Sequence, residues 1–311
     1  MKILVTGGTG LVGNALQKIH VLYPEDEFVF IGYNDCDLTN YMETKTFFKN
    51  IEPQCVIHLA ACVGGLYKNM NNKVEMFEKN ILMNYNVLKS CYEVGCMNCL
   101  SCLSTCIFPD KTTYPINEKM LHDGPPHHSN DAYAYAKRML EIQSKCYNEQ
   151  YGTNFICVIP TNIYGPHDNF HLEDGHVIPS LIHKCYLAKK LNQGFIIRGT
   201  GAPLRQFIFS EDLARLMMYV LKKYKSKETI ILSPSEKDEI SILNMGAIIA
   251  DSYKYFNIIF DESFSDGQYK KTANNQKLLS ILEDEFEFTP IKAGIEKTVQ
   301  WFIDNYETCR K

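Results

Sequence analysis

Lys2–Gly13, KILVTGGTGLVG, is the stretch that decides the fold. The apolar run Ile3–Val5 leads directly into Thr6–Gly13, where glycines recur at short intervals. Glycines let a chain turn tightly after a strand, let its backbone approach a pyrophosphate, and let the next helix pack closely. The N-terminus of that helix offers N–H groups and a partial positive charge to phosphates. An ordinary glycine-rich turn without a ligand is the alternative. We predict a dinucleotide site made by Gly7, Gly8, Thr9, Gly10, Leu11, Val12 and Gly13.

Further apolar runs predict a parallel sheet around this turn. Phe28–Gly32, Cys55–Ala61 and Phe155–Ile159 are short and apolar, as buried parallel strands are. The predicted helices include residues 11–23, 72–94, 241–256 and 291–306, with a short strand at 229–232. We therefore predict an α/β protein with a doubly wound parallel sheet of the Rossmann type and a smaller C-terminal α/β domain.

The chain shows no repeats, no low-complexity stretch and no flexible linker, so we expect two tightly docked domains. The first, residues 1–165, is predicted to bind NAD(P), and about 206–224 return to it. The second, residues 166–311, is predicted to bind the substrate and to close over the cofactor.

Composition excludes some partners. A net charge of −4 over 311 residues gives no general attraction to nucleic acid or to an anionic membrane. No apolar run approaches the length of a membrane span, and Met1–Lys2 opens directly into a strand rather than a signal peptide. We therefore expect a cytoplasmic protein whose 12 cysteines are thiols.

Four cysteines have the spacing of an iron–sulfur motif. Cys96-x2-Cys99-x2-Cys102-x3-Cys106 matches a bacterial run, but Ile107 stands where a proline is expected. Residues 98–104 also read as a buried strand, in which neighbouring side chains face opposite ways and cannot wrap one cluster. We predict buried thiols and no metal site, with the cluster as the alternative.

A serine, a tyrosine and a lysine predict chemistry at a carbonyl group. Ser104 follows the fourth predicted strand, and ligands of such sheets bind beyond the carboxyl ends of the strands. Tyr133 and Lys137 are four residues apart and share one helical face. The lysine charge can favour the phenolate, so that the tyrosine exchanges protons near neutral pH. We interpret the three residues as a set for hydride transfer; for Tyr133 and Lys137 alone, an exposed amphipathic helix is the alternative.

The residues expected to bind the cofactor's ribose weakly favour NAD. An acidic residue near the end of the second strand usually binds the ribose, and an arginine accommodates a 2′-phosphate. Tyr33–Leu38 contains acidic residues and no arginine or lysine. The alternative is a polar loop in which Asp37 starts a turn. His58 lies inside an apolar run, and we predict that it packs in the sheet rather than acts as a catalyst.

The turn Gly7-x2-Gly10-x2-Gly13, together with Tyr133 and Lys137, resembles the extended short-chain dehydrogenase/reductase superfamily. This resemblance implies contacts from Asp37 and Leu38 to the adenine ring. It also implies a structural role for Asn80, although a solvated helix face is the alternative for Asn80, Asn84 and Asn86. The loop that would line the nicotinamide pocket is Pro160, Thr161, Asn162 and Ile163.

Longer motifs resemble one family in this superfamily, the GDP-L-fucose synthases. These motifs are Leu103–Pro115, Pro160–His176 followed by Val177–Pro179, Arg205–Ile208 and Ser265–Gln268. The resemblance extends over essentially the whole chain. It implies 3,5-epimerisation of GDP-4-keto-6-deoxy-D-mannose, then NADPH-dependent reduction of the 4-keto group, by a homodimer. NADP(H) is thus implied by the family, not by visible basic residues.

The same resemblance implies roles for single residues. Cys106 would act as base and His176 as acid in the epimerisation, and His176 would also lie at the cofactor. Tyr133 would give the proton during reduction, Ser104 would hold the keto oxygen, and Lys137 would bind ribose. A buried thiol and a helix cap are the alternatives for Cys106 and His176.

The GDP-sugar would be bound by Lys184 and Arg205 at the diphosphate and by Asp266 at a hydroxyl. The family commonly has tryptophan where this chain has Arg198, so a charged or cation–π contact would replace stacking.

Two other functions stay open at this point. A nucleotide-sugar 4-epimerase or 4,6-dehydratase that retains NAD needs no acid–base pair at Cys106 and His176. A catalytically silent dinucleotide-binding regulator is the third possibility, although such proteins usually lose Tyr133 or Lys137.

Overall fold

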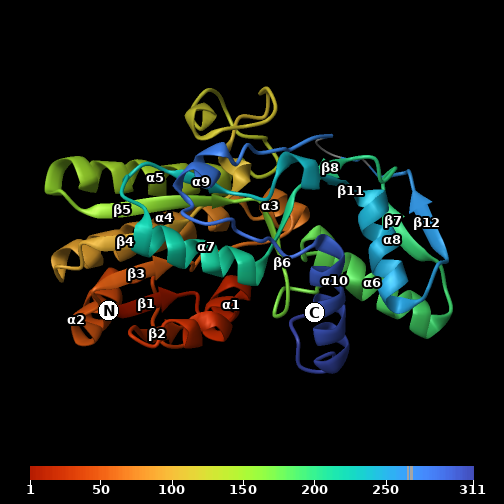
Figure 1. Ribbon diagram of the computed structural model, residues 1–311, viewed down its shortest axis with the longest axis horizontal. Coiled ribbons are helices and arrows are strands. Elements are labelled where there is room, and N and C mark those ends of the chain that lie inside the picture. Colours follow the sequence, from red (N-terminus) through yellow and green to blue (C-terminus); the bar gives the residue numbers. More distant parts are fainter. Residues whose placement is uncertain (265, 267–268) are drawn as a thin grey trace.

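The computed structural model describes residues 1–264, 266 and 269–311 and is built around one six-stranded parallel sheet (Figure 1). The strand order is β10-β5-β4-β3-β1-β2, and every neighbouring pair is parallel. β1 therefore lies between β2 and β3, and the sheet changes winding direction beside the glycine turn. This confirms the doubly wound α/β prediction. The strands are β1 (Lys2–Thr6), β2 (Glu27–Ile31), β3 (Cys55–His58), β4 (Asn98–Cys102), β5 (Asn154–Pro160) and β10 (Ile230–Leu232).

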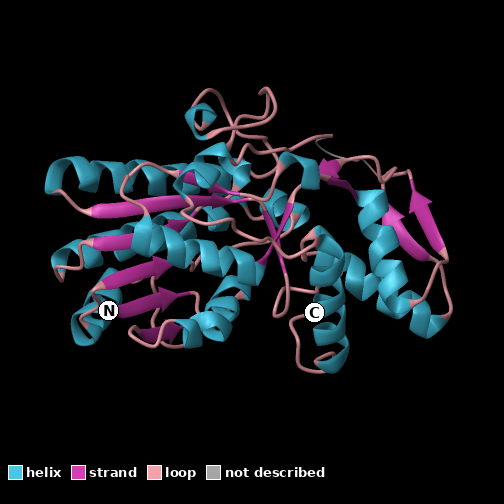
Figure 2. Cartoon of the chain, viewed as in Figure 1, coloured by secondary structure: helices cyan, strands magenta, loops and turns pink. Residues whose placement is uncertain are grey.

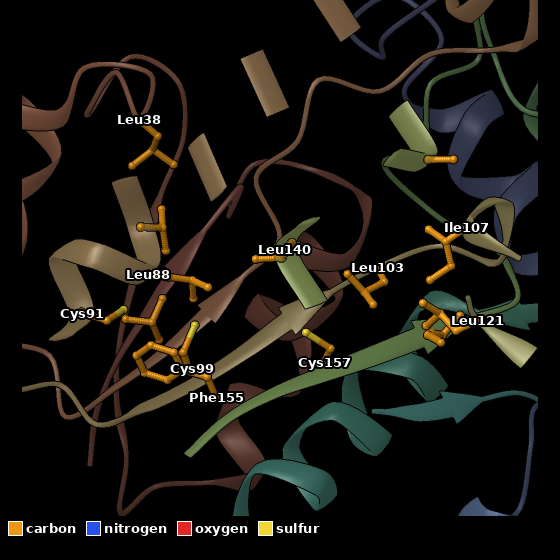
Figure 3. Packing of buried hydrophobic residues seen from close by; sticks show 14 of the residues in the cluster. Leu38, Leu88, Cys91, Cys99, Leu103, Ile107, Leu121, Leu140, Phe155 and Cys157 are labelled. Carbon is orange, nitrogen blue, oxygen red and sulfur yellow. The ribbon is translucent and has the colours of Figure 1, made fainter. Parts of the chain in front are cut away.

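Helices cover both faces of this sheet (Figure 2). α2 (Tyr41–Ile51), α4 (Lys73–Glu93) and α5 (Asp131–Tyr151) pack on one face, where Phe48, Leu88 and Leu140 are fully buried. Figure 3 shows part of this layer, with Cys99 and Phe155 of the strands beside Leu88 and Cys91 of α4. α1 (Leu11–Ile19), α7 (Ser210–Lys223) and α9 (Gln276–Ile281) pack on the other face. Burial of apolar side chains on both faces accounts for the continuous apolar runs in the strands.

The remaining elements form a smaller α/β layer with its own core. Phe170, Phe195, Met245 and Phe302 are fully buried there. Its elements are α6 (Val177–Leu191), α8 (Ile242–Tyr253), α10 (Ile291–Asp304), the parallel pair β7 (Phe195–Arg198) and β12 (Ile258–Asp261), and the antiparallel pair β8 (Leu204–Arg205) and β11 (Ile240–Ser241). The parallel pair β6 (Asn162–Tyr164) and β9 (Phe207–Phe209) runs between the two parts (Figure 1).

Two details differ from the sequence expectations. The first helix ends at Ile19, and His20–Leu22 continue as a 3₁₀ turn. More importantly, β10 pairs with β5, and Leu278 of α9 packs in the same core as β1. The sequence analysis placed residues 166–311, apart from about 206–224, in the second domain. Within that range, β10 and α9 also belong to the main sheet and its covering helices.

Buried amides on α4 correct another expectation. Asn80, Asn84 and Asn86 are almost completely buried, so the solvated-face interpretation is wrong. The Asn80 side chain accepts from the Cys62 N–H at 3.0 Å and donates to the Cys62 carbonyl oxygen at 2.9 Å. Since buried polar groups need partners, these amides tie α4 to the loops at the end of the sheet.

His58 packs inside the sheet as predicted. It is fully buried, and its ring nitrogens contact Thr6 Oγ1 at 2.8 Å and Asn84 Oδ1 at 3.1 Å. Burial, and secondly the nearby charge of Lys137, lower the pKa of His58 to about 3. The ring is therefore neutral and structural at neutral pH.

The iron–sulfur spacing falls on a strand. Cys99 and Cys102 are three residues apart on β4, and side chains alternate between the two faces along a strand. Cys99 therefore packs on one face of the sheet and Cys102 on the other. Within the described ranges, no group of three or more His, Cys, Asp or Glu side chains is arranged to hold a metal ion.

No helix in the described part of the chain has the length and apolar character needed to span a bilayer. Within the motif Ser265–Gln268, Ser265, Gly267 and Gln268 lie outside the described residues.

Candidate active site

The glycine turn has the geometry of a phosphate cradle. Gly7 has φ +70°, a left-handed conformation that favours glycine, and Gly10 N–H donates to the Gly7 carbonyl oxygen at 3.0 Å. A Cβ on Gly13 would lie 2.3 Å from the Gly8 carbonyl oxygen, so α1 can start this close to β1 only with glycine there. No side chain caps α1, and N–H groups in a first turn have no carbonyl of a preceding turn to bind. The backbone N–H groups of Leu11, Val12 and Gly13 can therefore bind an anion, and the cradle fits a dinucleotide pyrophosphate.

The predicted adenine contacts lie beyond β2. Leu38 is buried, and Asp37 Oδ1 accepts from the N–H of Thr39 at 2.9 Å and from its hydroxyl at 2.7 Å. Asp37 thus begins a turn, as the alternative interpretation had it. Its contact to adenine stays a prediction.

The nicotinamide loop follows β5 directly. The Thr161 N–H donates to the Leu232 carbonyl oxygen at 3.3 Å, and the Asn162 amide donates to the Gln206 carbonyl oxygen at 2.8 Å. Pro160 ends β5, and Ile163 is partly buried against the core of the main sheet. Among the described residues, the buried Thr161 hydroxyl has no hydrogen-bond partner, which leaves a polar atom for a ligand beside the sheet.

Ser104, Tyr133 and Lys137 meet near the carboxyl end of β4. Ser104 caps the 3₁₀ turn Thr105–Ile107, and its Oγ accepts from the Cys106 N–H at 3.4 Å. Lys137 is 1% exposed; its Nζ donates to the Cys102 carbonyl oxygen at 2.8 Å and lies 5.9 Å from the centre of the Tyr133 ring. The structure therefore places this set at the edge of the sheet where ligands bind.

The electrostatics of Tyr133 differ from the expectation of a phenolate. Burial raises the pKa of Tyr133 well above its usual range, and the neighbouring thiols of Cys106, Cys102 and Cys62 raise it further. Burial also lowers the pKa of Lys137. Tyr133 thus carries its proton, which is the form that can donate to an oxygen during reduction.

Cys106 is a buried thiol in the same place. It is 8% exposed, and burial raises its pKa, whereas Lys271, the Ser104 hydroxyl and Lys137 lower it. Burial thus favours the thiol, and the two cations stabilise the thiolate that a carbon base requires. A small cavity of about 10 Å³, roughly the size of one water molecule, lies beside it. This pocket is lined by Cys106, Phe108, Pro109, Thr112, Tyr114, Ile116, His127 and Lys271.

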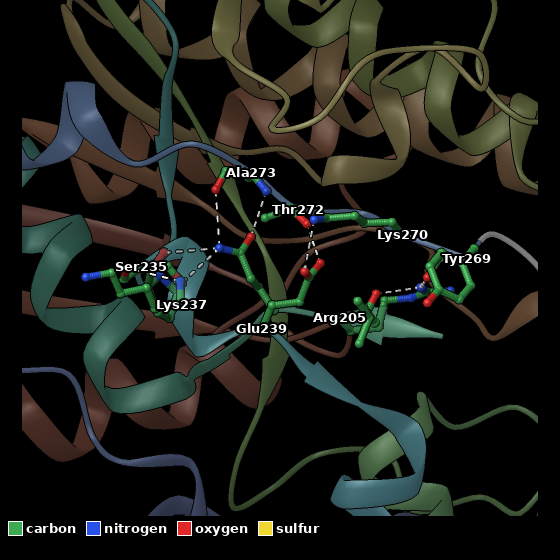
Figure 4. A network of polar contacts seen from close by, with 11 residues as sticks. Arg205, Ser235, Lys237, Glu239, Tyr269, Lys270, Thr272 and Ala273 are labelled. Carbon is green, nitrogen blue, oxygen red and sulfur yellow. Dashed lines mark hydrogen bonds and ion pairs between the residues drawn. The ribbon is translucent and has the colours of Figure 1, made fainter. Parts of the chain in front are cut away.

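Sequence reasoning missed Lys271. The segment that carries it is held by polar contacts to β8 and to the residues after it (Figure 4). The Gln206 Oε1 accepts from the Ala273 N–H at 2.7 Å, Thr272 bonds Glu239, and Lys270 pairs with Glu239 at 3.3 Å. The only signal in the sequence is a pair of lysines following Ser265–Gln268, and no local pattern connects it with Cys106.

His176 comes from a different segment, the N-terminal end of α6. It is exposed and precedes the first residue of α6, as the alternative interpretation of a helix cap had it, although its side chain caps nothing. Its charge acts on the buried Asp168. In the described ranges, no hydrogen bond or ion pair joins His176 to Cys106 or Tyr133. Its loop is tied to the first domain because the Gly65 N–H donates to the Asp174 carbonyl oxygen at 3.0 Å.

The residues predicted to bind the GDP-sugar belong to the smaller α/β layer. Arg198 forms a two-pronged ion pair with Glu173 at 2.7 and 3.0 Å and lies 4.5 Å over the Phe264 ring. Lys184 is half-buried on α6, and burial and the charge of Arg198 lower its pKa.

Arg205 and Asp266 both hold the chain in place here. Arg205 donates to the Leu204 carbonyl oxygen at 2.7 Å and to that of Tyr269 at 3.4 Å (Figure 4), and burial lowers its pKa. Asp266 accepts from both the N–H and the hydroxyl of Thr200 at 2.7 Å. A hydroxyl contact from Asp266 to a ligand stays a prediction.

Known proteins resemble this chain over most of its length. The family described as "NAD dependent epimerase/dehydratase family" matches residues 3–232. GDP-L-fucose synthase of Dictyostelium discoideum is 55% identical, covering 99% of this chain and 97% of that protein. A probable GDP-L-fucose synthase of Drosophila melanogaster is 48% identical, with 100% and 99% covered.

A solved structure shows the same fold. The crystal structure of a GDP-L-fucose synthetase from Naegleria fowleri bound to NADP is 50% identical, with a TM-score of 0.95 and 100% and 95% of the two chains covered. The chain therefore belongs to the NAD dependent epimerase/dehydratase family and, within it, to the GDP-L-fucose synthases.

Proposed function

We propose that this protein converts GDP-4-keto-6-deoxy-D-mannose into GDP-L-fucose, first by inverting C3 and C5 and then by reducing the 4-keto group. The observation that carries the proposal is the buried thiol of Cys106 beside Tyr133, with Lys271 and Lys137 near its sulfur. A plain carbonyl reductase needs Tyr133 and Lys137 but has no use for a thiol base. Relatives with the same activity in their names support the same substrate.

The epimerisation is assigned to Cys106 and His176. The 4-keto group makes the hydrogens at C3 and C5 acidic. The Cys106 thiolate takes one of them to give an enolate, and His176 returns a proton to the opposite face of that carbon. Lys271 and Lys137 favour the charged sulfur. His176 is exposed at the start of α6, so its imidazole is open to a ligand.

The reduction is assigned to the residues at the end of β4 and on α5. NADPH, when bound, supplies a hydride to C4. Ser104 orients the keto oxygen, Tyr133 gives it a proton, and Lys137 binds the nicotinamide ribose. The glycine turn holds the pyrophosphate on α1. The Naegleria structure carries NADP, which supports NADP(H) although Tyr33–Leu38 lacks a basic residue.

Lys184 and Arg205 are assigned to the diphosphate, with Arg198 and Asp266 at the nucleotide-sugar. We further propose a homodimer in the cytoplasm and two domains, residues 1–165 and 166–311, with about 206–224, β10 and α9 returning to the first. Apolar side chains exposed on α4 and α5 support the dimer: Phe77, Leu82, Tyr85, Tyr135, Met139 and Ile142.

One experiment tests the whole proposal. Purified protein is mixed with NADPH and GDP-4-keto-6-deoxy-D-mannose in deuterium oxide, and the product sugar is identified. We expect GDP-L-fucose with deuterium at C3 and C5. A product with unexchanged C3 and C5 would overturn the double inversion. Release of NAD from freshly denatured protein would instead favour a cofactor-retaining 4-epimerase or 4,6-dehydratase.

A further inference from the structure

His127 presents a hydrogen-bond donor whose position is set by its neighbours. Its Nδ1 lies 3.2 Å from the Ser129 N–H and 2.8 Å from the Ser129 hydroxyl. An imidazole nitrogen that accepts from a backbone N–H carries no proton itself, so the ring proton of neutral His127 lies on Nε2. Ser129 is 7% exposed, which keeps water from competing for these contacts.

Asp110 places an acceptor beside this donor. The Asp110 N–H donates to the Pro125 carbonyl oxygen at 2.9 Å, and Pro109 pairs with Pro126 in an antiparallel bridge. These contacts hold the two loops together, with His127 Nε2 3.9 Å from Asp110 Oδ1. That separation is too long for a hydrogen bond. One hydroxyl oxygen between the two atoms, however, can lie within hydrogen-bond distance of both.

The histidine of this pair faces the cavity beside Cys106. His127 lines the same pocket as Cys106 and Lys271, and the His127 and Asp110 side chains are about one-third exposed. Arg205, assigned above to the diphosphate, acts electrostatically on both Lys271 and Tyr114 of this pocket. A sugar whose diphosphate lies at Arg205 and whose reacting carbons lie at Cys106 would therefore pass His127.

We propose that His127 and Asp110 together bind a ring hydroxyl of the sugar, with Nε2–H donating to its oxygen and the carboxylate accepting its proton. This inference rests on the proposed function. The hydroxyl is the one on C2: the C3 hydroxyl changes sides when C3 is inverted, whereas a fixed donor and acceptor can hold the C2 hydroxyl throughout. His127 is thus a substrate-binding residue, and the loop that leads into α5 contributes to sugar specificity.

Ser129, His127 and Asp110 resemble a hydrolytic triad in composition, but the geometry excludes that role. In a triad the serine is the nucleophile and must reach the substrate. Ser129 is buried and its hydroxyl contacts Nδ1 of His127, so Nε2 is the ring nitrogen left for a ligand. The serine therefore orients the histidine.

The test compares variants on two substrates. His127→Phe removes the donor, and we expect kcat/KM for GDP-4-keto-6-deoxymannose to fall roughly 10- to 100-fold, mostly through KM. Asp110→Asn, which removes the charged acceptor, should behave alike. His127→Gln keeps an N–H near the same position and should retain activity to within about 5-fold. NADPH affinity should not change.

The second substrate is the 2-deoxy analogue, on which wild type, H127F and D110N should have the same kcat/KM within about 3-fold, because the contact no longer exists. His122→Phe, an exposed residue of the same loop paired with Glu141, is the matched control. Thermal unfolding of each variant identifies general damage. Equal kcat/KM of H127F and wild type, or a penalty that persists on the 2-deoxy analogue, would overturn the inference. Loss of GDP-L-fucose formation by wild type would instead overturn the proposed function.

Discussion

The side-chain nitrogen of Lys137 donates a 2.8 Å hydrogen bond to the backbone carbonyl oxygen of Cys102, the last residue of β4. This contact joins α5 to the sheet immediately before Ser104 and Cys106. It also fixes a positive charge near both the thiol and the phenol without pairing it with either. Because burial dominates, Tyr133 keeps its proton and the Cys106 pKa is raised. Tyr133 can thus donate a proton, whereas Cys106 must lose its proton before it can act as a base.

Replacing the phenol separates reduction from epimerisation. Tyr133→Phe removes the proton donor for C4, so we expect NADPH oxidation with GDP-4-keto-6-deoxymannose to slow by about 10²- to 10⁴-fold. Deuterium incorporation at C3 and C5 should stay within a few-fold of wild type. NADPH absorbance and NMR of the sugar measure the two steps. Equal losses in both would assign Tyr133 to the epimerisation as well.

Replacing the thiol should have the opposite effect. Cys106→Ser exchanges an ionisable sulfur for a hydroxyl that does not ionise near neutral pH, so deuterium incorporation at C3 and C5 should disappear. NADPH binding should remain, since the glycine turn is untouched. Cys91→Ser, a fully buried thiol on α4, is the control for the loss of a buried sulfur. Exchange that continues unchanged in the Cys106 variant would remove the proposed base.

The charge of Lys271 should set the pH dependence of the exchange. Its ammonium lowers the pKa of Cys106, so Lys271→Met raises that pKa and reduces the thiolate present at neutral pH. We expect roughly tenfold slower deuterium exchange at pH 7 and a deficit that shrinks as the pH rises, since one pKa unit is a factor of ten. Lys270→Met, which breaks an ion pair with Glu239 instead, is the matched control. A deficit independent of pH would mean that Lys271 acts on substrate binding alone.

Two glycines of the turn should respond differently to alanine. A Cβ on Gly13 would meet the Gly8 carbonyl oxygen at 2.3 Å, whereas one on Gly10 would meet only the Gly7 carbonyl oxygen at 3.2 Å. We expect Gly13→Ala to lower the free energy of unfolding by about 2 kcal/mol or more, because backbone must move. Gly10→Ala should lower the free energy of unfolding by under about 1 kcal/mol. It should nevertheless weaken NADPH binding, because the chain approaches the pyrophosphate at this glycine. Urea unfolding and NADPH fluorescence titration measure the two effects; equal loss of stability in both variants would contradict the prediction.

The buried His58 should make stability depend on pH. Its pKa of about 3 lies below the ordinary value near 6.5, so the unfolded chain takes up the proton first as the pH falls. His58 therefore contributes stability that is complete above pH 6.5 and is lost as the pH falls toward 3, by up to about 1.4 kcal/mol per pH unit. Between pH 8 and pH 5, His58→Gln should lose about 2 kcal/mol less than wild type. Urea unfolding at both pH values measures this, with the exposed His20→Gln as control; the same loss in both variants would refute a neutral His58.

Local sequence patterns were sufficient for the parts of the site that lie on one element. Spacing along one strand, turn or helix accounts for the glycine turn, the burial of His58 in β3 and the placement of Tyr133 and Lys137 on one helical face. The strand pattern of residues 98–104 likewise separates Cys99 from Cys102. Longer motifs added the family, and with it Cys106.

The tertiary structure decided what depends on distant segments. Asn80 and Asn86 are buried against loops and Asn84 against His58 of β3 and Ala136 of α5, which no periodicity of the helix records. The return of β10 to β5 is set by long-range pairing.

In the end, the sequence by itself determined the sheet and the dinucleotide turn and predicted Tyr133 and Lys137 as a reducing pair, because each pattern is encoded in neighbouring residues. Only the folded chain decided that Lys271 stands beside Cys106, that His127 faces the same pocket, and that Tyr133 keeps its proton. The physical reason is that neighbouring charges and burial shift a group's pKa through space. The residues that supply the charge and the burial come from segments far apart in the chain.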